Sequence, residues 1–388
     1  MRVCVVYDCL YPHTVGGGER WYRNLAERLS AEGHDVTYLT LRQWARGASP
    51  QIDGVRVAVA GPRMELYANG RRRIVPPLVF GAGVFWHLLR RGRVYDVVHC
   101  SSFPYFSLLA AALLRRLCGY DLVVDWLEVW SREYWREYLG RAARAGVAVQ
   151  RRCARVRQRA FCLSELHAAR LRAAGLRGEV TVLRGLLSSS VEAEEPLAAE
   201  PLVVFAGRLI PEKSAPAVVD AVALAAERIP GLHGIVFGDG PDREAVHERI
   251  AQLSSPEVVS APGFVDGDAV HAALRRACCL LLPSRREGYG LVVVEAAAVG
   301  TPAILVSAPD NAAVELIEEG VNGTVVPSAQ PEVLADAIEA VWAGGPPLRA
   351  ATAAWFARNR ERLSIESSLE AVVESYAALR SARGERGR

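Results

Sequence analysis

The chain has 388 residues, of which 51% are hydrophobic and 23% are charged, and its formal net charge is +3. This length is more than one hydrophobic core usually holds, so we expect two domains. A charge so close to balance gives no reason to expect a nucleic-acid partner. No apolar run approaches the roughly 18 residues of a membrane span, and residues 1–8 are typical of a strand rather than a signal peptide.

The eight cysteines are spread over the chain and include no C-x-x-C pair. Cys4, Cys162, Cys278 and Cys279 lie in apolar, strand-like runs. The spacing therefore predicts neither a zinc site nor a disulfide framework. Reduced thiols in a cytoplasmic protein are the simpler interpretation, and we expect no metal and no organic cofactor.

Apolar runs alternate with helical patterns through the first half of the chain. Residues 19–32 have apolar side chains at helical spacing, and Gly33 ends this pattern. Alternating strands and helices predict a parallel sheet in an α/β domain. The expected strands are residues 2–8, 35–40, 55–60, 96–100, 122–126, 160–164 and 180–183.

The same alternation resumes after an acidic, proline-containing stretch, 188–200, which we interpret as a linker. We therefore expect an N-terminal domain over 1–187 and a C-terminal domain over 201–360. A helical pattern at 349–380, with a break at 359–364, leads into a polar end, 381–388, that we expect to be frayed. The strands expected in the second half are 202–206, 234–238, 258–265, 278–283, 303–306 and 323–326.

A strand, a glycine turn and a helix follow one another between residues 278 and 300. The turn contains Gly288 and Gly290. Unpaired N–H groups at such a helix start suit a phosphate. Glu287 stands at the mouth of the turn, and Glu295 stands over one turn into the helix, within reach of hydroxyl groups on the same ligand. Phosphate together with hydroxyls suggests a sugar nucleotide; a strand–helix corner with a solvated glutamate is the alternative.

Two cations, Arg208 and Lys213, follow the apolar run 201–206. Side chains just past the carboxyl end of a strand lie where open α/β sheets bind ligands. Arginine can hold a phosphate with two hydrogen bonds, and lysine supplies a point charge. Either cation alone is more often a solvated surface residue, but together with the glutamate turn they indicate a diphosphate clamp.

Four motifs together resemble the GT-B glycosyltransferases of family 4, a group that includes glycogen synthases and mannosyltransferases. They are the glutamate pair, the Gly-Arg-x-x-x-x-Lys segment, Gly238-Asp239-Gly240 and Gly16-Gly17-Gly18-Glu19. The resemblance runs in order over nearly the whole chain and is strongest at 201–326. It implies two Rossmann-like domains facing a central cleft, with a nucleotide-diphosphate-sugar donor held mainly by the C-terminal domain. It also implies metal-independent transfer with retention, and a segment 361–388 that packs back on the N-terminal domain.

The resemblance implies roles for the donor-site residues. Arg208 and Lys213 would neutralise the leaving diphosphate, and Glu287 would hold donor-sugar hydroxyls. Glu295 would hold the ribose, and the backbone near Val265 would read the edge of the base. The expected donor set is Gly17, Gly18, Arg208, Lys213, Gly238, Asp239, Val265, Glu287, Gly288, Tyr289, Gly290, Leu291, Val292 and Glu295, with Arg208, Lys213 and Glu287 as the catalytic residues.

Three short motifs have local alternatives. Gly16-Gly17-Gly18 is either a flexible turn or, by the resemblance, the loop that caps the donor diphosphate from the opposite domain. Gly238-Asp239-Gly240 is either a simple turn or a loop near the base and ribose. Asp266-Gly267-Asp268 has the form of a D-x-D metal motif, but it matches the helix-entry acid of the resembled family, so we expect no metal there.

Departures from the resembled family fall on the N-terminal domain. Ser101 stands where relatives often carry a second histidine after His99, and Leu127 stands where some carry a histidine. These changes favour an unusual donor or weakened catalysis. His99 itself is compatible with a hydrogen-bonded histidine at a strand end.

A dense set of aromatic residues and carboxylates at 126–138 suits stacking on sugar rings, and core packing is the alternative. The expected acceptor contacts are His99, Ser101, Trp126, Glu128 and Trp130.

Arginines bracket an apolar stretch within residues 71–93. A basic amphipathic segment can lie on an anionic membrane, which would place the protein at the inner membrane face. A buried helix with solvated ends fits the pattern equally well.

The resemblance thus predicts a retaining hexosyltransferase that moves a sugar from a nucleotide-diphosphate sugar to a hydroxyl of a polysaccharide, lipid-linked or natural-product acceptor. A catalytically weakened GT-B module that binds a sugar or a partner is one alternative. Another is a different GT-B chemistry, such as a sugar-nucleotide epimerase or a pyridoxal-phosphate phosphorylase. Lys213 is the sole lysine of the C-terminal half, and it suits a phosphate better than a Schiff base.

Overall fold

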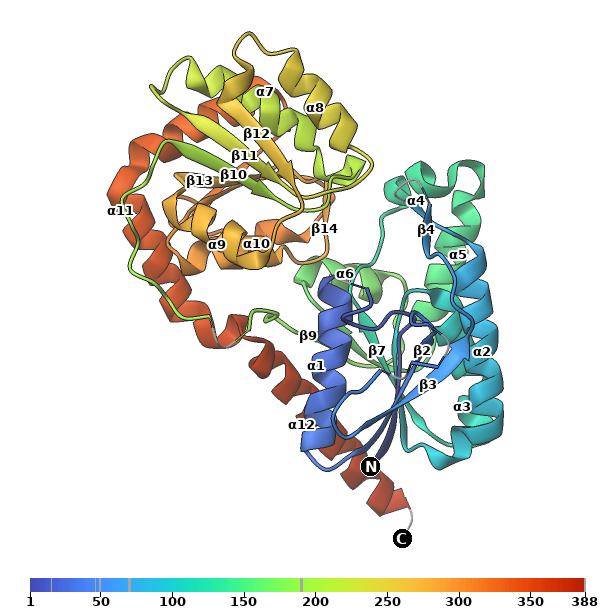
Figure 1. The fold of residues 1–388 in the computed structure, drawn as a ribbon. Helices are drawn as coiled ribbons and strands as arrows, with labels where there is room; N and C mark the ends of the chain where they lie inside the picture. Colours follow the sequence, from blue (N-terminus) through green and yellow to red (C-terminus); the bar gives the residue numbers. More distant parts are fainter. Residues whose placement is uncertain (15, 46, 49, 69–70, 189–190, 387–388) are drawn as a thin grey trace. The chain divides into compact units, whose positions relative to one another are not determined.

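The computed structural model describes residues 1–14, 16–45, 47–48, 50–68, 71–188 and 191–386. The chain forms two compact units (Figure 1). Unit 1 comprises Met1–Arg184 and Glu366–Arg388, and unit 2 comprises Gly185–Ile365. Each unit is built on a parallel β-sheet with helices packed against it, as the alternating sequence pattern predicts.

Unit 1 has a seven-stranded sheet in the order β3-β2-β1-β6-β7-β8-β9, and every pair in it is parallel. The strands are β1 (Arg2–Val6), β2 (Asp35–Leu41), β3 (Val55–Gly61), β6 (Val97–Ser101), β7 (Asp121–Trp126), β8 (Arg159–Cys162) and β9 (Val180–Val182). The helices are α1 (Gly17–Ala31), α2 (Val75–Arg91), α3 (Tyr105–Cys118), α4 (Arg132–Leu139), α5 (Ala143–Ala154) and α6 (Glu165–Ala173), with 3₁₀ turns at Gly92–Val94 and Gly140–Ala142. A short antiparallel pair joins β4 (Tyr67–Ala68) to β5 (Arg71–Arg72).

Unit 2 has a six-stranded parallel sheet in the order β12-β11-β10-β13-β15-β17. The strands are β10 (Leu202–Ala206), β11 (His233–Phe237), β12 (Val259–Gly263), β13 (Cys279–Leu282), β15 (Ala303–Val306) and β17 (Gly323–Val326). The helices are α7 (Ala215–Ala226), α8 (Arg243–Ala251), α9 (Gly267–Arg276), α10 (Leu291–Ala298) and α11 (Pro331–Leu363), with 3₁₀ turns at Pro211–Lys213, Pro256–Val258 and Ala312–Leu316. A second short pair joins β14 (Arg286–Glu287) to β16 (Asp310–Asn311).

The central strands are continuous apolar runs because helices cover both faces of each sheet. In β10 the side chains of Leu202, Val203, Val204 and Phe205 are fully buried. Each of the strands predicted from the sequence is present. The predicted strand 258–265 ends early, at Gly263, because this residue has a φ of +90°.

The last helix of the chain, α12 (Ile365–Arg386), belongs to unit 1. It is separated from α11 by Ser364, whose ψ of 146° breaks the helical path. Tyr376 of α12 is fully buried, and its hydroxyl lies 2.9 Å from Nδ1 of His99 in β6. The helix α12 continues to Arg386, and residues 387–388 lie outside the described residues. The expected frayed end, 381–388, stays a prediction.

The predicted linker at 188–200 needs correction, because this stretch belongs to unit 2. Its acidic residues suggested solvent exposure, but the Glu194 carboxylate binds His271 at 2.8 Å and Arg275 at 2.6 Å, both on α9. Residues 189–190 lie outside the described ranges. The chain instead passes between the units after Arg184 and again after Ile365.

The described part of the chain contains no helix with the length and apolar character that a membrane crossing requires. All eight cysteines are free thiols.

Candidate functional site

The donor residues expected in the second half of the chain gather at one edge of the unit 2 sheet. Because its strands are parallel, the loops after β10, β11, β12 and β13 all leave from their carboxyl ends. The neighbours β10 and β13 form the topological switch point: the chain builds the sheet outward from β10 in one direction and from β13 in the other. Open α/β sheets bind ligands at this position.

An ion pair joins the two loops that flank the switch point. Nζ of Lys213, after β10, bonds to Oε1 of Glu287, after β13. These side chains are only 15% and 10% exposed. The buried Ser284 hydroxyl donates to the same carboxylate oxygen at 2.9 Å. Glu287 is therefore held by a cation and a hydroxyl group, so the alternative of a solvated glutamate does not apply to it.

Glu212 ties the same two loops together a second time. The Arg285 N–H donates to the Glu212 carbonyl at 2.8 Å, and the Arg286 guanidinium lies 3.5 Å from the Glu212 carboxylate. Burial, with a smaller contribution from Glu212, raises the pKa of Asp242 above its usual range. Charged groups from three loops therefore crowd this edge of the sheet.

The glycine turn leads directly into α10. Gly290 precedes the helix with a φ of +94°, a left-handed conformation that glycine adopts at little cost. Most of α10 is buried, and its half-buried residues, which reach the surface, are Leu291, Val292 and Glu295. Amides in a first helical turn have no partner within the helix, so the N-terminus of α10 offers N–H groups suited to an anion.

The loop after β11 lies against the loop after β10, backbone to backbone. The Leu209 N–H donates to the Asp239 carbonyl at 2.9 Å. A Cβ atom on Gly238, where φ is +132°, would lie 1.8 Å from the Gly207 carbonyl oxygen. The Asp239 side chain is exposed and accepts a 2.8 Å hydrogen bond from the Gly240 N–H.

The other expected donor residues of unit 2 differ in exposure. The Arg208 side chain is exposed, and Gly288 and Val265 are half-buried. Tyr289 is buried, and burial raises its pKa despite a hydrogen bond with the Leu186 backbone. The Tyr289 ring therefore packs into the unit, and only its backbone is placed to contribute to the turn.

Asp266, the first acid of the D-x-D sequence, caps α9. Its carboxylate accepts a 2.8 Å hydrogen bond from the Ala269 N–H. Within the described ranges, no group of three or more His, Cys, Asp or Glu side chains is arranged to hold a metal ion.

The N-terminal glycines occupy a different place from the one expected. We expected them in a loop before a helix, but Gly17 and Gly18 form the first turn of α1, and Gly16 precedes it. Glu19 is buried, and its carboxylate folds back over Gly16, because a Cβ atom there would lie 2.4 Å from Oε2 of Glu19.

His99 and Ser101 do not offer a surface to an acceptor in this structure. His99 is fully buried, and Ser101 is 2% exposed. The His99 ring binds Tyr376 through Nδ1 at 2.9 Å and Asp125 through Nε2 at 2.8 Å. Asp125 in turn accepts a 2.7 Å hydrogen bond from the Trp21 indole. The alternative of a hydrogen-bonded histidine therefore describes His99.

The aromatic cluster at 126–138 is mainly core. Trp126 is fully buried, and its indole donates to Gln158 at 2.8 Å, so its expected acceptor role needs correction. Trp135 is 4% exposed and packs 4.7 Å from the Trp130 ring. Trp130 and Glu128 are half-buried and joined by a 2.7 Å hydrogen bond, so they alone of the expected acceptor residues reach the surface.

Sequence reasoning missed the residues that position the charged groups. Ser284 holds Glu287, and the buried Asn311 donates to the Ser284 carbonyl at 3.0 Å. In unit 1, the buried Asp8 forms an ion pair with Arg72. Ser284 lies three positions before Glu287, so the sequence could have suggested their contact. Asp8 and Arg72 lie 64 positions apart, and no local pattern connects them.

Two family models match the chain in succession. Residues 16–185 match the glycosyl transferase 4-like domain, and residues 191–354 match the glycosyl transferases group 1 model. The solved structure of Anabaena HepE in complex with UDP and glucose superposes with a TM-score of 0.72, at 19% identity, over 97% of this chain and 99% of that one. The chain has the GT-B fold, with two glycosyltransferase-type domains. The GT-B fold expected from the sequence is thereby confirmed.

Individual relatives of this GT-B protein differ in coverage. Glycogen synthase of Mycobacterium tuberculosis is 26% identical over 411 aligned positions, which cover 100% of this chain and 96% of that protein. The α-D-kanosaminyltransferase of Streptomyces kanamyceticus is 30% identical over 139 residues, or 36% of each chain. For this enzyme and two further relatives, the match spans only 26% to 36% of the relative's own length.

The contact between the loops after β10 and β11 predicts that Gly238→Ala destabilises unit 2 more than Gly231→Ala does. Both glycines have positive φ, but a Cβ atom on Gly231 would meet nothing closer than Pro201 Cγ at 3.8 Å. We expect an additional loss of about 1–3 kcal/mol at Gly238, the scale of overpacking, in urea unfolding. Equal losses in the two variants would contradict the backbone contact.

Proposed function

We propose that this protein transfers a sugar from a nucleotide-diphosphate sugar to an acceptor hydroxyl group. The observation that carries the proposal is the Lys213–Glu287 pair across the switch point of the unit 2 sheet, beside the N-terminus of α10. The family matches over both halves of the chain support it. The name of the solved HepE complex, which contains UDP and glucose, supports a nucleotide-sugar donor.

Charge development at the leaving group explains why cations are needed. As the bond from the anomeric carbon to the phosphate oxygen breaks, negative charge grows on the diphosphate. Lys213 and Arg208, with the amides of Leu291 and Val292, stabilise that charge from fixed positions. Because Lys213 is paired with Glu287 before the donor binds, we propose that the diphosphate takes over the lysine. Glu287, still held by Ser284, then accepts hydrogen bonds from the donor sugar.

We further propose that transfer proceeds with retention. The acceptor oxygen bonds to the anomeric carbon on the face from which the phosphate leaves, and the acceptor proton passes to an oxygen of the departing phosphate. This route needs no protein base. Glu287 keeps its hydrogen bond from Ser284 after the diphosphate takes over Lys213, which suits it to binding hydroxyls better than to removing a proton.

Binding without transfer is a second candidate, favoured by one observation. Ser101 and Leu127 stand at positions where the resemblance implies histidines in other family members. In addition, His99 is enclosed by its hydrogen bonds with Tyr376 and Asp125. A mass-spectrometric assay for a glycosylated product, over a panel of nucleotide sugars and acceptors, separates the two. Nucleotide-sugar binding with no product from any pair would favour the binding module.

The diphosphate clamp predicts that Lys213→Ala weakens the binding of a nucleotide diphosphate by about 1–2 kcal/mol, the scale of a lost charge-assisted contact. A thermal-shift screen with UDP, GDP, ADP and dTDP selects the nucleotide, because a ligand stabilises the state that binds it. Titration calorimetry then gives the affinity.

Lys213→Arg should recover part of the Lys213→Ala loss, because it keeps the charge. Arg228→Ala is the control, since Arg228 pairs with Asp336 at 2.6 Å on the surface of unit 2, and it should bind normally. Unchanged affinity in Lys213→Ala would refute the clamp.

The two glutamates should have separable effects. Glu287→Ala should lower turnover strongly, because it removes contacts to the transferred sugar that strengthen in the transition state. It should not weaken nucleotide binding, since it also releases Lys213 for the diphosphate. Glu295→Ala should instead weaken nucleotide binding. Steady-state kinetics and calorimetry of both variants test this, and a Glu287→Ala enzyme with the parental turnover would show that Glu287 has no such role.

We also propose that transfer requires no divalent metal ion. Asp266 is committed to capping α9, and divalent cations such as Mg²⁺ need carboxylate or phosphate oxygens arranged around them. Activity should be the same with and without EDTA. If chelation abolishes transfer and Mg²⁺ or Mn²⁺ restores it, this part of the proposal is wrong.

A further inference from the structure

Helices α2 and α3 of unit 1 lie side by side and run in the same direction (Figure 1). Near their starts, a Cβ atom on Gly81 would lie 2.6 Å from Phe106 Cβ. Near their ends, a Cβ atom on Gly92 would lie 2.7 Å from Cys118 Sγ. The two helices therefore form one continuous ridge whose carboxyl ends are adjacent.

The outer surface of this ridge is apolar. On α2, Val75 is 58% exposed and Trp86 is 52% exposed, and on α3, Leu113 is 71% exposed. Of the twelve large apolar side chains that are exposed in the described residues, nine lie in α2, in α3 or next to the ends of α2. Val59 lies on β3, which packs beside α2, and Leu197 and Phe264 lie in unit 2. We define the α2–α3 face as Val59, Ile74, Val75, Leu78, Trp86, Leu89, Val94, Phe106, Leu113 and Leu117. Exposed apolar side chains gathered on two adjacent helices are typical of an interaction site.

The two stretches that carry most of the α2–α3 face contain arginines and no acidic residues. Residues 66–95 and 102–120 contain no Asp or Glu. Their arginines are Arg71, Arg72, Arg73, Arg90, Arg91, Arg93, Arg115 and Arg116. Three of these arginines meet acids that border the face: Arg72 pairs with Asp8, Arg73 lies 2.8 Å from Glu65, and Arg115 lies 3.8 Å from Asp121. Arg90, Arg91, Arg93 and Arg116 are exposed at the shared carboxyl end of the two helices.

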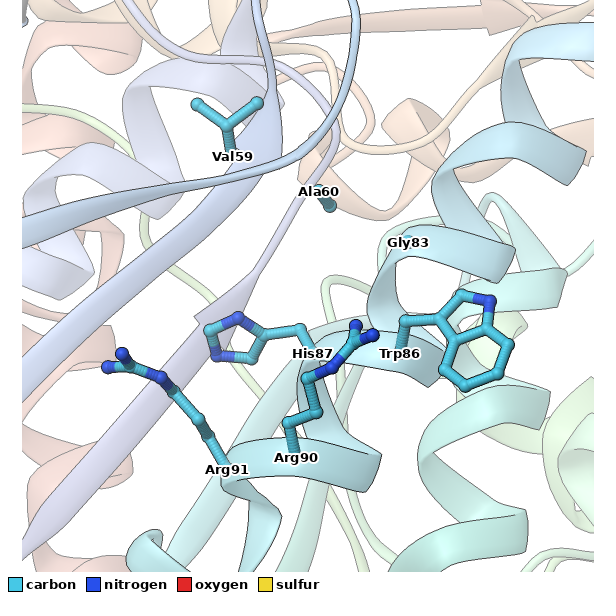
Figure 2. A pocket seen from close by; sticks show the side chains of 7 residues that line it. All are labelled: Val59, Ala60, Gly83, Trp86, His87, Arg90 and Arg91. Atoms are coloured by element: carbon cyan, nitrogen blue, oxygen red, sulfur yellow. The ribbon is translucent and has the colours of Figure 1, made fainter.

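A hollow of about 440 Å³ lies between β3 and α2. Figure 2 shows His87 between Arg91 and Arg90, with Val59 and Ala60 of β3 across the hollow. The helix comes this close to the strand because position 83 is glycine: a Cβ atom there would lie 1.6 Å from the Ala60 carbonyl oxygen. Burial and Arg91 lower the pKa of His87, so the positive charge at the hollow comes from Arg90 and Arg91.

We propose that the α2–α3 face docks on an anionic lipid bilayer. Its apolar side chains enter the boundary between headgroups and acyl chains, and its arginines bind lipid phosphates, with Arg90 and Arg91 at the hollow. A second copy of this chain is a poorer partner for this face. Two copies of the α2–α3 face packed against each other would place arginine against arginine, with no acidic residue in the two stretches to balance the charge. The proposal does not rest on sugar transfer, since binding is measured without nucleotide or acceptor.

The test is flotation of the full chain with vesicles of phosphatidylcholine, with and without phosphatidylglycerol. We expect binding to the anionic vesicles, weakening as salt is raised, and little binding to phosphatidylcholine alone. Leu113→Ser with Leu117→Ser, and separately Arg90→Glu with Arg93→Glu, should each lower the bound fraction about tenfold or more. These positions are exposed, and circular dichroism confirms that the variants fold.

Arg144→Glu with Arg151→Glu on α5 is the control, because it makes the same charge change as Arg90→Glu with Arg93→Glu at two other exposed positions of unit 1. It should retain most binding. No binding by the parental chain, or an equal loss in the α5 variant and in the face variants, would overturn the proposal.

A second measurement locates the contact. Brominated lipids should quench the fluorescence of Trp86, and Trp86→Phe should remove that quenched component. Quenching that is unchanged in Trp86→Phe would overturn the placement. Light scattering in the absence of lipid measures whether the chain forms a dimer. A dimer that becomes a monomer in the variant Leu113→Ser with Leu117→Ser would show that a second copy of the chain, and not a membrane, covers the face.

Discussion

The arrangement of the candidate site depends on the ion pair between Lys213 and Glu287. Each charge sits in a largely buried position, where it would be costly without the other, so the pair fixes the loops on both sides of the switch point relative to each other. The loop after β11 is attached to the loop after β10 by backbone hydrogen bonds, and the Gly238 N–H bonds to the Gly263 carbonyl at the end of β12. The Lys213–Glu287 pair and the second link through Glu212 therefore hold the loops at the carboxyl edge of the unit 2 sheet together.

Unit 1 repeats this arrangement in different residues. Its switch point lies between β1 and β6, and Asp8, directly after β1, pairs with Arg72 of β5. Burial lowers the pKa of Arg72, and Asp8 is completely enclosed. Both units thus place opposite charges from separate segments at the position where a parallel sheet is open to ligands. In unit 2 the pair includes residues proposed to bind the donor. In unit 1 the sequence did not single out Asp8, and it marked Arg72 only as one of the arginines that bracket the apolar stretch.

The sequence predicts the sheets well because strands buried on both faces are continuous apolar runs, as in β10 and β15. It does not predict β4, β5, β14 or β16, since two-residue pairs have no periodicity. The glycine turn and α10 follow from local residue order, whereas Lys213 meets Glu287 because both follow neighbouring strands of the parallel sheet. The burial of His99 could not be predicted, because its partner Tyr376 lies 277 positions away. The linker prediction failed since acidic residues can pair with arginines on a helix, as Glu194 does, instead of facing solvent.

The return of α12 to unit 1 makes that unit discontinuous in the chain, with the whole of unit 2 inserted between its parts. A ribosome releases the seven strands of the unit 1 sheet long before it releases Tyr376. Until then Nδ1 of His99 has no tyrosine hydroxyl to bind, and the surface that α12 covers stays open to water. Unit 2 is contiguous, so it can complete its own core first. The order of completion is therefore the reverse of the order of synthesis: the domain that emerges first is the last to be finished.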